Sequence, residues 1–156
     1  MILDRPLPAL YNLQQVRLVP ELSGYKGGAV LNIRHTQSME DYLEAILMIQ
    51  QERGLCRSVD VAARLGFTKP SVSIAMKNLA TSGYVSKAGE NGLQLTEKGL
   101  RIAQATLERH RFLCAFFTDL GVAPDVAERD ACGMEHSISE ESFEKFRDWY
   151  TKQHRQ

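Results

Sequence analysis

The spacing of hydrophobic and polar positions predicts a mainly helical protein with one small hairpin. Ser38, followed by Asp41 three residues later, is a capping-box pattern, so we expect the first helix to begin there. Residues 1–37 hold three of the five prolines without sustained periodicity, which indicates an irregular N-terminal extension. Apolar residues recur at the three-to-four-residue spacing of a helix in four segments: 38–53, 97–119, 126–136 and a last one from about 139.

The middle of the chain has the pattern of a helix-turn-helix. Residues 58–65 form a short helical segment, and Gly66-Phe67 a tight turn. Pro70 falls in the first turn of the next helix, where its missing N–H costs little. This second helix has an apolar inner face, and its outer residues are candidates for contact with bases and phosphates: Thr68, Lys69, Pro70, Ser71, Ser73 and Lys77. A packed helical hairpin without a ligand is the alternative.

Two short alternating segments, 84–87 and 93–95, follow this helix and predict a β-hairpin around a glycine-rich turn. A hairpin in this place is the wing of a winged helix. Such a wing commonly lies along the DNA backbone, so Lys87 is a candidate phosphate contact. We therefore expect a winged helix-turn-helix DNA-binding domain over 38–96, followed by an all-helical domain over 97–156.

The net charge of zero hides a division along the chain. Residues 57–102 contain seven basic and three acidic residues, a net +4, whereas residues 103–156 contain seven basic and ten acidic residues, a net −3. This division suggests that a polyanion and a cation are handled by different parts. Random scatter over so few charges is the alternative.

Composition also bears on where the chain acts. No apolar run approaches the roughly 20 residues that span a bilayer. The N-terminus has no uninterrupted signal-peptide core, and the three cysteines form no regular disulfide framework. We expect a cytoplasmic protein with no membrane partner.

Two groups of residues have the chemistry of metal ligands. Cys132, Glu135 and His136 lie at i, i+3 and i+4, so a helix brings a thiol, a carboxylate and an imidazole to one face. A metal site and a coincidence on a polar face both fit this pattern. Asp41 and Glu44 lie one turn apart near a predicted helix N-terminus, where the helix dipole favours acidic residues, so helix capping is the alternative to metal binding.

The last predicted helix is rich in aromatic residues. So many large rings on a terminal helix of a small chain suggest burial against a partner subunit. Packing within the same chain is the alternative. The residues concerned are Phe143, Phe146, Trp149 and Tyr150.

Four blocks together resemble the diphtheria-toxin repressor family, and more closely its short branch, the manganese transport regulators. The blocks are residues 38–44, the helix-turn-helix with its wing, Arg109-His110 and residues 130–139, and the resemblance covers about 38–152. It implies a homodimeric repressor that binds double-stranded operator DNA when a divalent cation is bound. It also implies that the helical domain serves dimerisation and metal binding.

The resemblance further implies which residues hold the cation. Cys114 and Glu128 occupy positions of ancillary ligands in the iron branch, although a buried thiol that packs as a small hydrophobe is the alternative for Cys114. The family's main metal ligands, carried over by position, fall on Asp41, Glu44, His110, Cys132, Glu135 and His136.

Cys132 departs from the pattern of the manganese branch, which has a glutamate there. The iron branch has a cysteine at that position but a methionine where this chain has Asp41. Carboxylates and imidazoles suit Mn²⁺, whereas a thiolate favours softer or later metals. We therefore expect Mn²⁺ or Fe²⁺ as the cofactor, with Co²⁺, Ni²⁺ or Zn²⁺ able to bind in vitro.

Two other functions fit parts of the same pattern. One is a winged-helix regulator that responds to an organic ligand or to oxidation of Cys132. The other is a metal-dependent hydrolase, because the same ligand types hold catalytic metals.

Overall fold

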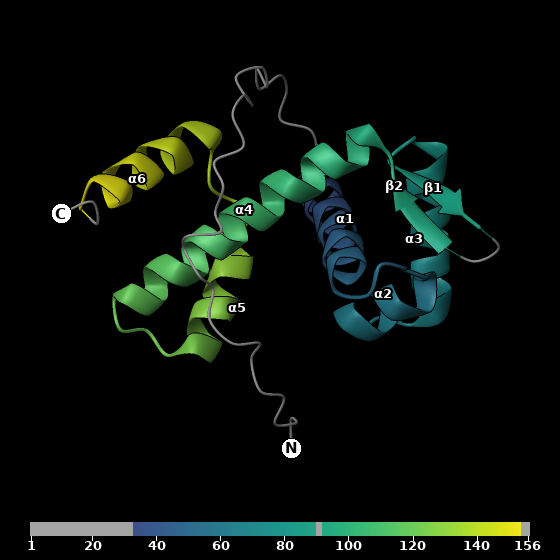
Figure 1. The fold of residues 1–156 in the computed structure, drawn as a ribbon, viewed down its shortest axis with the longest axis horizontal. Helices are drawn as coiled ribbons and strands as arrows, with labels where there is room; N and C mark the ends of the chain where they lie inside the picture. The colour runs from purple at the N-terminus through teal and green to yellow at the C-terminus, as the bar shows by residue number, and fades with distance from the viewer. Residues whose placement is uncertain (1–32, 90–91, 154–156) are drawn as a thin grey trace.

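A computed structural model describes residues 33–89 and 92–153, which form six helices and one two-stranded antiparallel sheet (Figure 1). The predicted mainly helical class is confirmed. In chain order the elements are α1 (Ile33–Arg53), α2 (Ser58–Leu65), α3 (Lys69–Thr81), β1 (Val85–Ala88), β2 (Gly92–Leu95), α4 (Glu97–Asp119), α5 (Pro124–Glu135) and α6 (Glu140–Gln153).

Helix α1 begins earlier than the sequence predicts. It starts at Ile33, so Ser38 lies inside the helix, and the predictions of a cap at Ser38 and of an irregular segment over 33–37 are wrong. Residues 33–37 contain neither glycine nor proline, and therefore nothing in their backbone stops the helix from extending towards the N-terminus. The rest of the predicted extension, residues 1–32, lies outside the described residues.

The predicted helix-turn-helix is confirmed, and local chemistry explains its turn. Gly66 ends α2 with φ of 70°, and its N–H donates to the Ala62 carbonyl. This left-handed conformation costs glycine little because it has no Cβ. Thr68 then caps α3, since its side-chain oxygen accepts a hydrogen bond from the Ser71 N–H.

The predicted wing is also confirmed. In the hairpin, β1 and β2 pair antiparallel, with Val85 opposite Leu95 and Ala88 opposite Gly92. Val85 and Leu95 are buried, whereas Lys87 is exposed. Residues 90–91 of the predicted turn lie outside the described residues.

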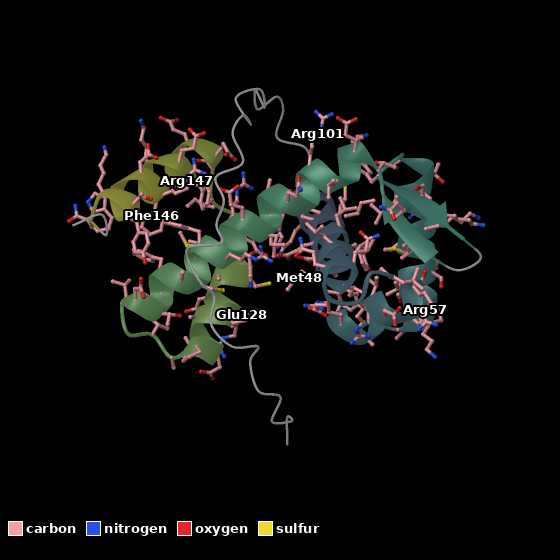
Figure 2. All side chains as sticks on the ribbon, in the orientation of Figure 1. Met48, Arg57, Arg101, Glu128, Phe146 and Arg147 are labelled. Atoms are coloured by element: carbon pink, nitrogen blue, oxygen red, sulfur yellow. The ribbon has the colours of Figure 1, made fainter. Side chains whose placement is uncertain are left out.

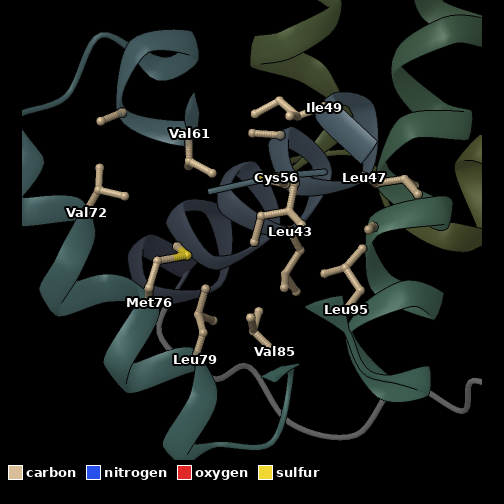
Figure 3. Packing of buried hydrophobic residues seen from close by; sticks show 14 of the residues in the cluster. Leu43, Leu47, Ile49, Cys56, Val61, Val72, Met76, Leu79, Val85 and Leu95 are labelled. Atoms are coloured by element: carbon tan, nitrogen blue, oxygen red, sulfur yellow. The ribbon is translucent and has the colours of Figure 1, made fainter. Parts of the chain in front are cut away.

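The main hydrophobic core packs α1 against α2, α3 and the wing (Figure 3). These three elements are the ones predicted to bind DNA, and together they are called the DNA reader. Leu43 of α1 is fully buried and belongs to the same cluster as Val72 of α3 and Val85 of the wing. Figure 3 shows these side chains converging between the helices and the hairpin, together with Val61 of α2. Helix α1 therefore packs as one unit with the DNA reader, so a shift of α1 moves α3 as well.

A second, smaller core joins the C-terminal helices. The Phe112 ring of α4 lies edge-on to the rings of Phe143, Phe146 and Tyr150 of α6 at centroid distances of 5.3 to 5.4 Å. Figure 2 shows Phe146 on the side of α6 that faces α4. The alternative of packing within the chain therefore holds for these three residues, whereas Trp149 is 55% exposed.

Helix α4 connects the two cores. Its N-terminal half contributes Ala103 and Leu107 to the first core, and its C-terminal half contributes Leu113 to the second. Figure 1 shows it running from the wing to the turn that leads into α5. None of the helices in the described part of the chain has the length and apolar character needed to cross a membrane.

Candidate metal centre

Helix α1 supplies three acidic side chains to the space between the two cores. Asp41 and Glu44 lie one turn apart, as predicted, and Glu40 precedes them. Glu44 is 9% exposed, and carboxylates are rarely buried this far. Since α1 packs along α4, these carboxylates face the C-terminal half of the molecule.

Helices α4 and α5 supply the other half of the cluster. His110 of α4 is buried, and its Nδ1 lies 2.7 Å from Oε2 of Glu135, which is fully buried at the end of α5. His136 caps the C-terminal end of α5 and Cys132 lies one turn earlier, where its thiol is exposed. Gly121, with φ of 87°, allows the turn that folds α5 back onto α4.

The two halves meet at His136. Its Nε2 lies 2.8 Å from Oδ1 of Asp41 and 3.1 Å from Oε1 of Glu135. Ligand atoms of Cys132, Glu135 and His136 lie within 4.8 Å of one another, and so do those of Glu44, His110 and Glu135. The structure thus brings all six predicted main ligands into one cluster, although α1 and α5 are far apart in the sequence.

Glu44 Oε1 is buried without a hydrogen-bond partner in the described part of the chain, and the buried atoms Glu135 Oε1 and His136 Nε2 lie 3.1 Å apart without forming a well-aligned hydrogen bond. Buried polar atoms are normally hydrogen-bonded, because burial without a partner costs about 1–3 kcal/mol each. A divalent cation accepts lone pairs from carboxylate oxygens and from an imidazole nitrogen at the same time. The donor set therefore fits a metal ion.

Protonation is the other way to stabilise such a cluster. Burial raises the pKa of Glu44 to about 7, and the neighbouring Glu135 carboxylate adds to this shift. Burial lowers the pKa values of His110 and His136, but the hydrogen bonds that their rings make with neighbouring acidic side chains outweigh it and raise both above the ordinary range. Protons therefore neutralise the acidic cluster in the metal-free protein, and a cation has to replace them.

Glu40 is a functional candidate that the sequence reasoning missed. Its Oε2 lies 2.7 Å from Nδ1 of His136, while Nε2 of the same ring faces Asp41 and Glu135. Carboxylates commonly hold a ligating histidine in this way, fixing the ring and raising its basicity. The available signal was that a ligating histidine needs a partner for its second nitrogen.

The predicted ancillary residues form a second group beside the first. Nε2 of His110 lies 3.1 Å from Oε1 of Glu128, and Cys114 Sγ lies 3.3 Å from the other oxygen of Glu128. Figure 2 labels Glu128 on α5, where its side chain is partly exposed. The two ring nitrogens of His110 therefore face different groups, and Cys114 also packs in the second core.

The predicted DNA-facing residues lie away from this cluster. All are exposed: Thr68 caps α3, five others lie along α3 from its first turn to Lys77, and Lys87 lies on β1. They are Thr68, Lys69, Pro70, Ser71, Ser73, Lys77 and Lys87.

Metal affinity should fall as the pH falls below 7. The pKa of Glu44 is raised from 4.5 to about 7, so in this range the folded protein holds a proton that the unfolded chain releases. A cation must displace that proton. We expect the apparent affinity for Mn²⁺ to drop at least about fivefold from pH 7 to pH 6. Calorimetric titration in buffers of different protonation enthalpy measures proton release; a pH-independent affinity without release would contradict the raised pKa.

Replacing Glu40 by Gln should weaken metal binding without unfolding the protein. The Glu40→Gln side chain cannot supply the charge that holds Nδ1 of His136, and loss of such a partner typically costs about 10- to 100-fold in affinity. Glu52→Gln is the matched control, because the Glu52 carboxylate lies on the same helix but binds Arg64. Mn²⁺ titration with circular dichroism measures both effects. Equal affinity of the two variants would remove Glu40 from the centre.

Comparisons with known proteins agree with this arrangement. The model of the iron dependent repressor N-terminal DNA binding domain matches residues 34–93, and that of the iron dependent repressor metal binding and dimerisation domain matches residues 96–152. The chain is 40% identical over 139 residues to the transcriptional regulator MntR of Escherichia coli O157:H7, covering 88% of this chain and 89% of that protein. It is 34% identical over 113 residues to the HTH-type transcriptional regulator MntR of Geobacillus kaustophilus, covering 72% and 80%.

Solved structures show the same fold. The manganese regulator SloR superposes with a TM-score of 0.65 at 25% identity, covering 72% of this chain and 53% of that one. A manganese-dependent transcriptional repressor in complex with manganese gives 0.58 at 30% identity, covering 66% and 48%. The chain thus spans about half the length of these two solved chains. With both of its domains matched, the chain belongs to the iron-dependent repressor family of metal-dependent transcriptional regulators, as its four sequence blocks predicted.

Proposed function

We propose that this chain is a homodimeric repressor that controls metal homeostasis by binding operator DNA when a divalent cation links its two domains. One observation carries the proposal. Carboxylates of α1, a helix whose apolar face belongs to the core of the DNA reader, meet His110, Glu135 and His136 of the other domain in a buried cluster with unsatisfied atoms. A cation bound in this cluster would tie the two domains together.

The proposed ligands are Asp41, Glu44, His110, Cys132, Glu135 and His136, and the cation supplies a positive charge that all of them share. Without that charge, Glu44 and Glu135 repel each other whenever both are ionised, so α1 is held less firmly against α4 and α5. With it, the α1 carboxylates stay against His136, and the DNA reader keeps one orientation. Repression then depends on removal of the entropic cost of ordering the DNA reader. Because coupling is reciprocal, DNA must strengthen metal binding by the same factor by which metal strengthens DNA binding.

On DNA, the two α3 helices of a dimer would enter successive major grooves. Lys69, Lys77 and Lys87 are exposed cations suited to phosphate contacts, and Ser73 offers a hydroxyl to bases or phosphates. Thr68 and Ser71 are hydrogen-bonded to each other at the start of α3, which orients the first turn, and Pro70 stiffens it.

Mn²⁺ or Fe²⁺ is the proposed cofactor. Support for manganese comes from two similar solved proteins, which are described as a manganese regulator and a manganese-dependent repressor, and from the carboxylate-rich ligand set. Support for iron comes from the family description and from the thiol of Cys132. Co²⁺, Ni²⁺ or Zn²⁺ should bind in vitro. His110, Cys114 and Glu128 are proposed as an ancillary site, because their ligand atoms also lie within 4.8 Å of one another.

We further propose that the chain acts in the cytoplasm, as a regulator without catalytic activity. Its relatives are named as transcriptional regulators, and both matched domain models describe DNA binding, metal binding or dimerisation.

Metal should strengthen DNA binding at least about tenfold, because it removes the ordering cost. Duplexes selected from a random library by the Mn²⁺-loaded protein serve as ligands, and fluorescence polarisation with Mn²⁺ or with chelator gives the two affinities. Asp41→Ala should abolish the difference, since Asp41 joins α1 to His136. Asp148→Ala, an exposed aspartate of α6, should keep it. Equal affinity of the wild-type protein with and without metal would falsify the proposal.

The side chain of Cys132 should determine the order in which different metals activate DNA binding. Changing Cys132 to Glu replaces the soft thiolate by a hard carboxylate. We expect the Zn²⁺ concentration for half-maximal DNA binding to rise by about tenfold, while that for Mn²⁺ changes little. Cys132→Ser separates loss of the thiol from gain of the carboxylate. An unchanged order of metals in both variants would show that Cys132 does not ligate the ion.

A further inference from the structure

Ile74 of α3 is an apolar side chain where solvent-exposed polar residues are expected. It is 65% exposed, the same fraction as Leu120. It lies on the side of α3 opposite Val72 and Met76, which are buried in the first core. Ile74 therefore contributes little to the fold.

The surroundings of Ile74 form the outward face of the reading helix. Pro70 and Ser71 lie one turn before it and Lys77 and Asn78 one turn after it, and all four are exposed. The Ser71 hydroxyl is 2.8 Å from that of Thr68, so it already serves the start of the helix. The centre of this face is thus an aliphatic group between a capped helix start and a lysine.

The chemistry of DNA offers one apolar group to such a face. In the major groove, the edges of bases present donors and acceptors, except for the 5-methyl group of thymine. An isoleucine can neither donate nor accept a hydrogen bond, but it gains free energy when a methyl group removes it from water. Its branched Cβ also leaves one strongly preferred rotamer in a helix, so its contact surface is fixed before DNA binds.

We propose that Ile74 determines sequence specificity by packing against the 5-methyl group of a thymine in each operator half-site. Neighbouring Lys77 supplies attraction to the backbone, which does not depend on sequence. The inference rests on the proposed placement of α3 in the major groove, but it can fail while metal-dependent DNA binding stands.

The test removes single methyl groups from the DNA. Full-length protein with saturating Mn²⁺ first selects its preferred duplexes from a random library. Each thymine of the selected half-site is then replaced by deoxyuridine, and affinities are measured for the wild-type protein and for Ile74→Ala. At one thymine, deoxyuridine should weaken wild-type binding about fourfold, the effect of exposing one methyl-sized group. The same replacement should leave Ile74→Ala binding unchanged.

Leu120→Ala is the matched control, because Leu120 has the same exposed fraction but ends α4, away from α3. It should keep the full deoxyuridine effect even if its overall affinity changes. Circular dichroism checks that Ile74→Ala is folded. A deoxyuridine penalty that is the same in Ile74→Ala and in the wild-type protein at every thymine would overturn the proposal. So would a loss of affinity in Ile74→Ala that is equal on all duplexes, which would assign Ile74 to a surface that reads no base.

Discussion

The contact of His136 with the carboxylates of α1 is the constraint on which the functional architecture depends. Its two ring nitrogens lie 2.7 Å from Glu40 and 2.8 Å from Asp41, so one imidazole touches two side chains of another domain. Helix α1 shares its apolar face with the DNA reader, and His136 ends a helix packed against α4. A change in charge at this contact therefore changes how firmly the DNA reader is attached to α4 and α5.

Local sequence patterns predicted the helices, the turn and the wing, but they could not predict how these elements pack against one another. Periodicity and turn chemistry gave the helix-turn-helix and the wing, because Gly66, Thr68 and Pro70 act through the backbone of their own neighbours. Periodicity also placed Cys132 and Glu135 on one face. It could not tell that Asp41 would meet His136, because that contact depends on how α1 packs along α4. Only the family resemblance indicated this pairing in advance.

The misses have physical causes of the same kind. Ser38 looked like a helix cap, but capping requires that the preceding residues leave the helix, and residues 33–37 contain nothing that forces them out. Glu40 lies one turn before Glu44 on the same face of α1, but the sequence reasoning took its ligands from the family positions and so passed over Glu40. Ile74 is apolar, so a search of α3 for polar DNA contacts passed over it, and only its exposure marks it.

The acid–base state of the cluster explains why such a site suits a switch. A carboxyl group with the ordinary pKa would be ionised at neutral pH, and its charge would oppose Glu135 strongly whenever metal is absent. The pKa of Glu44 is instead raised to about 7, so near neutral pH a proton competes with a cation for this carboxylate. A small free-energy difference between two states is what allows a ligand to shift the population from one to the other. Burial of Glu44 beside Glu135 therefore couples metal binding to proton release near neutral pH.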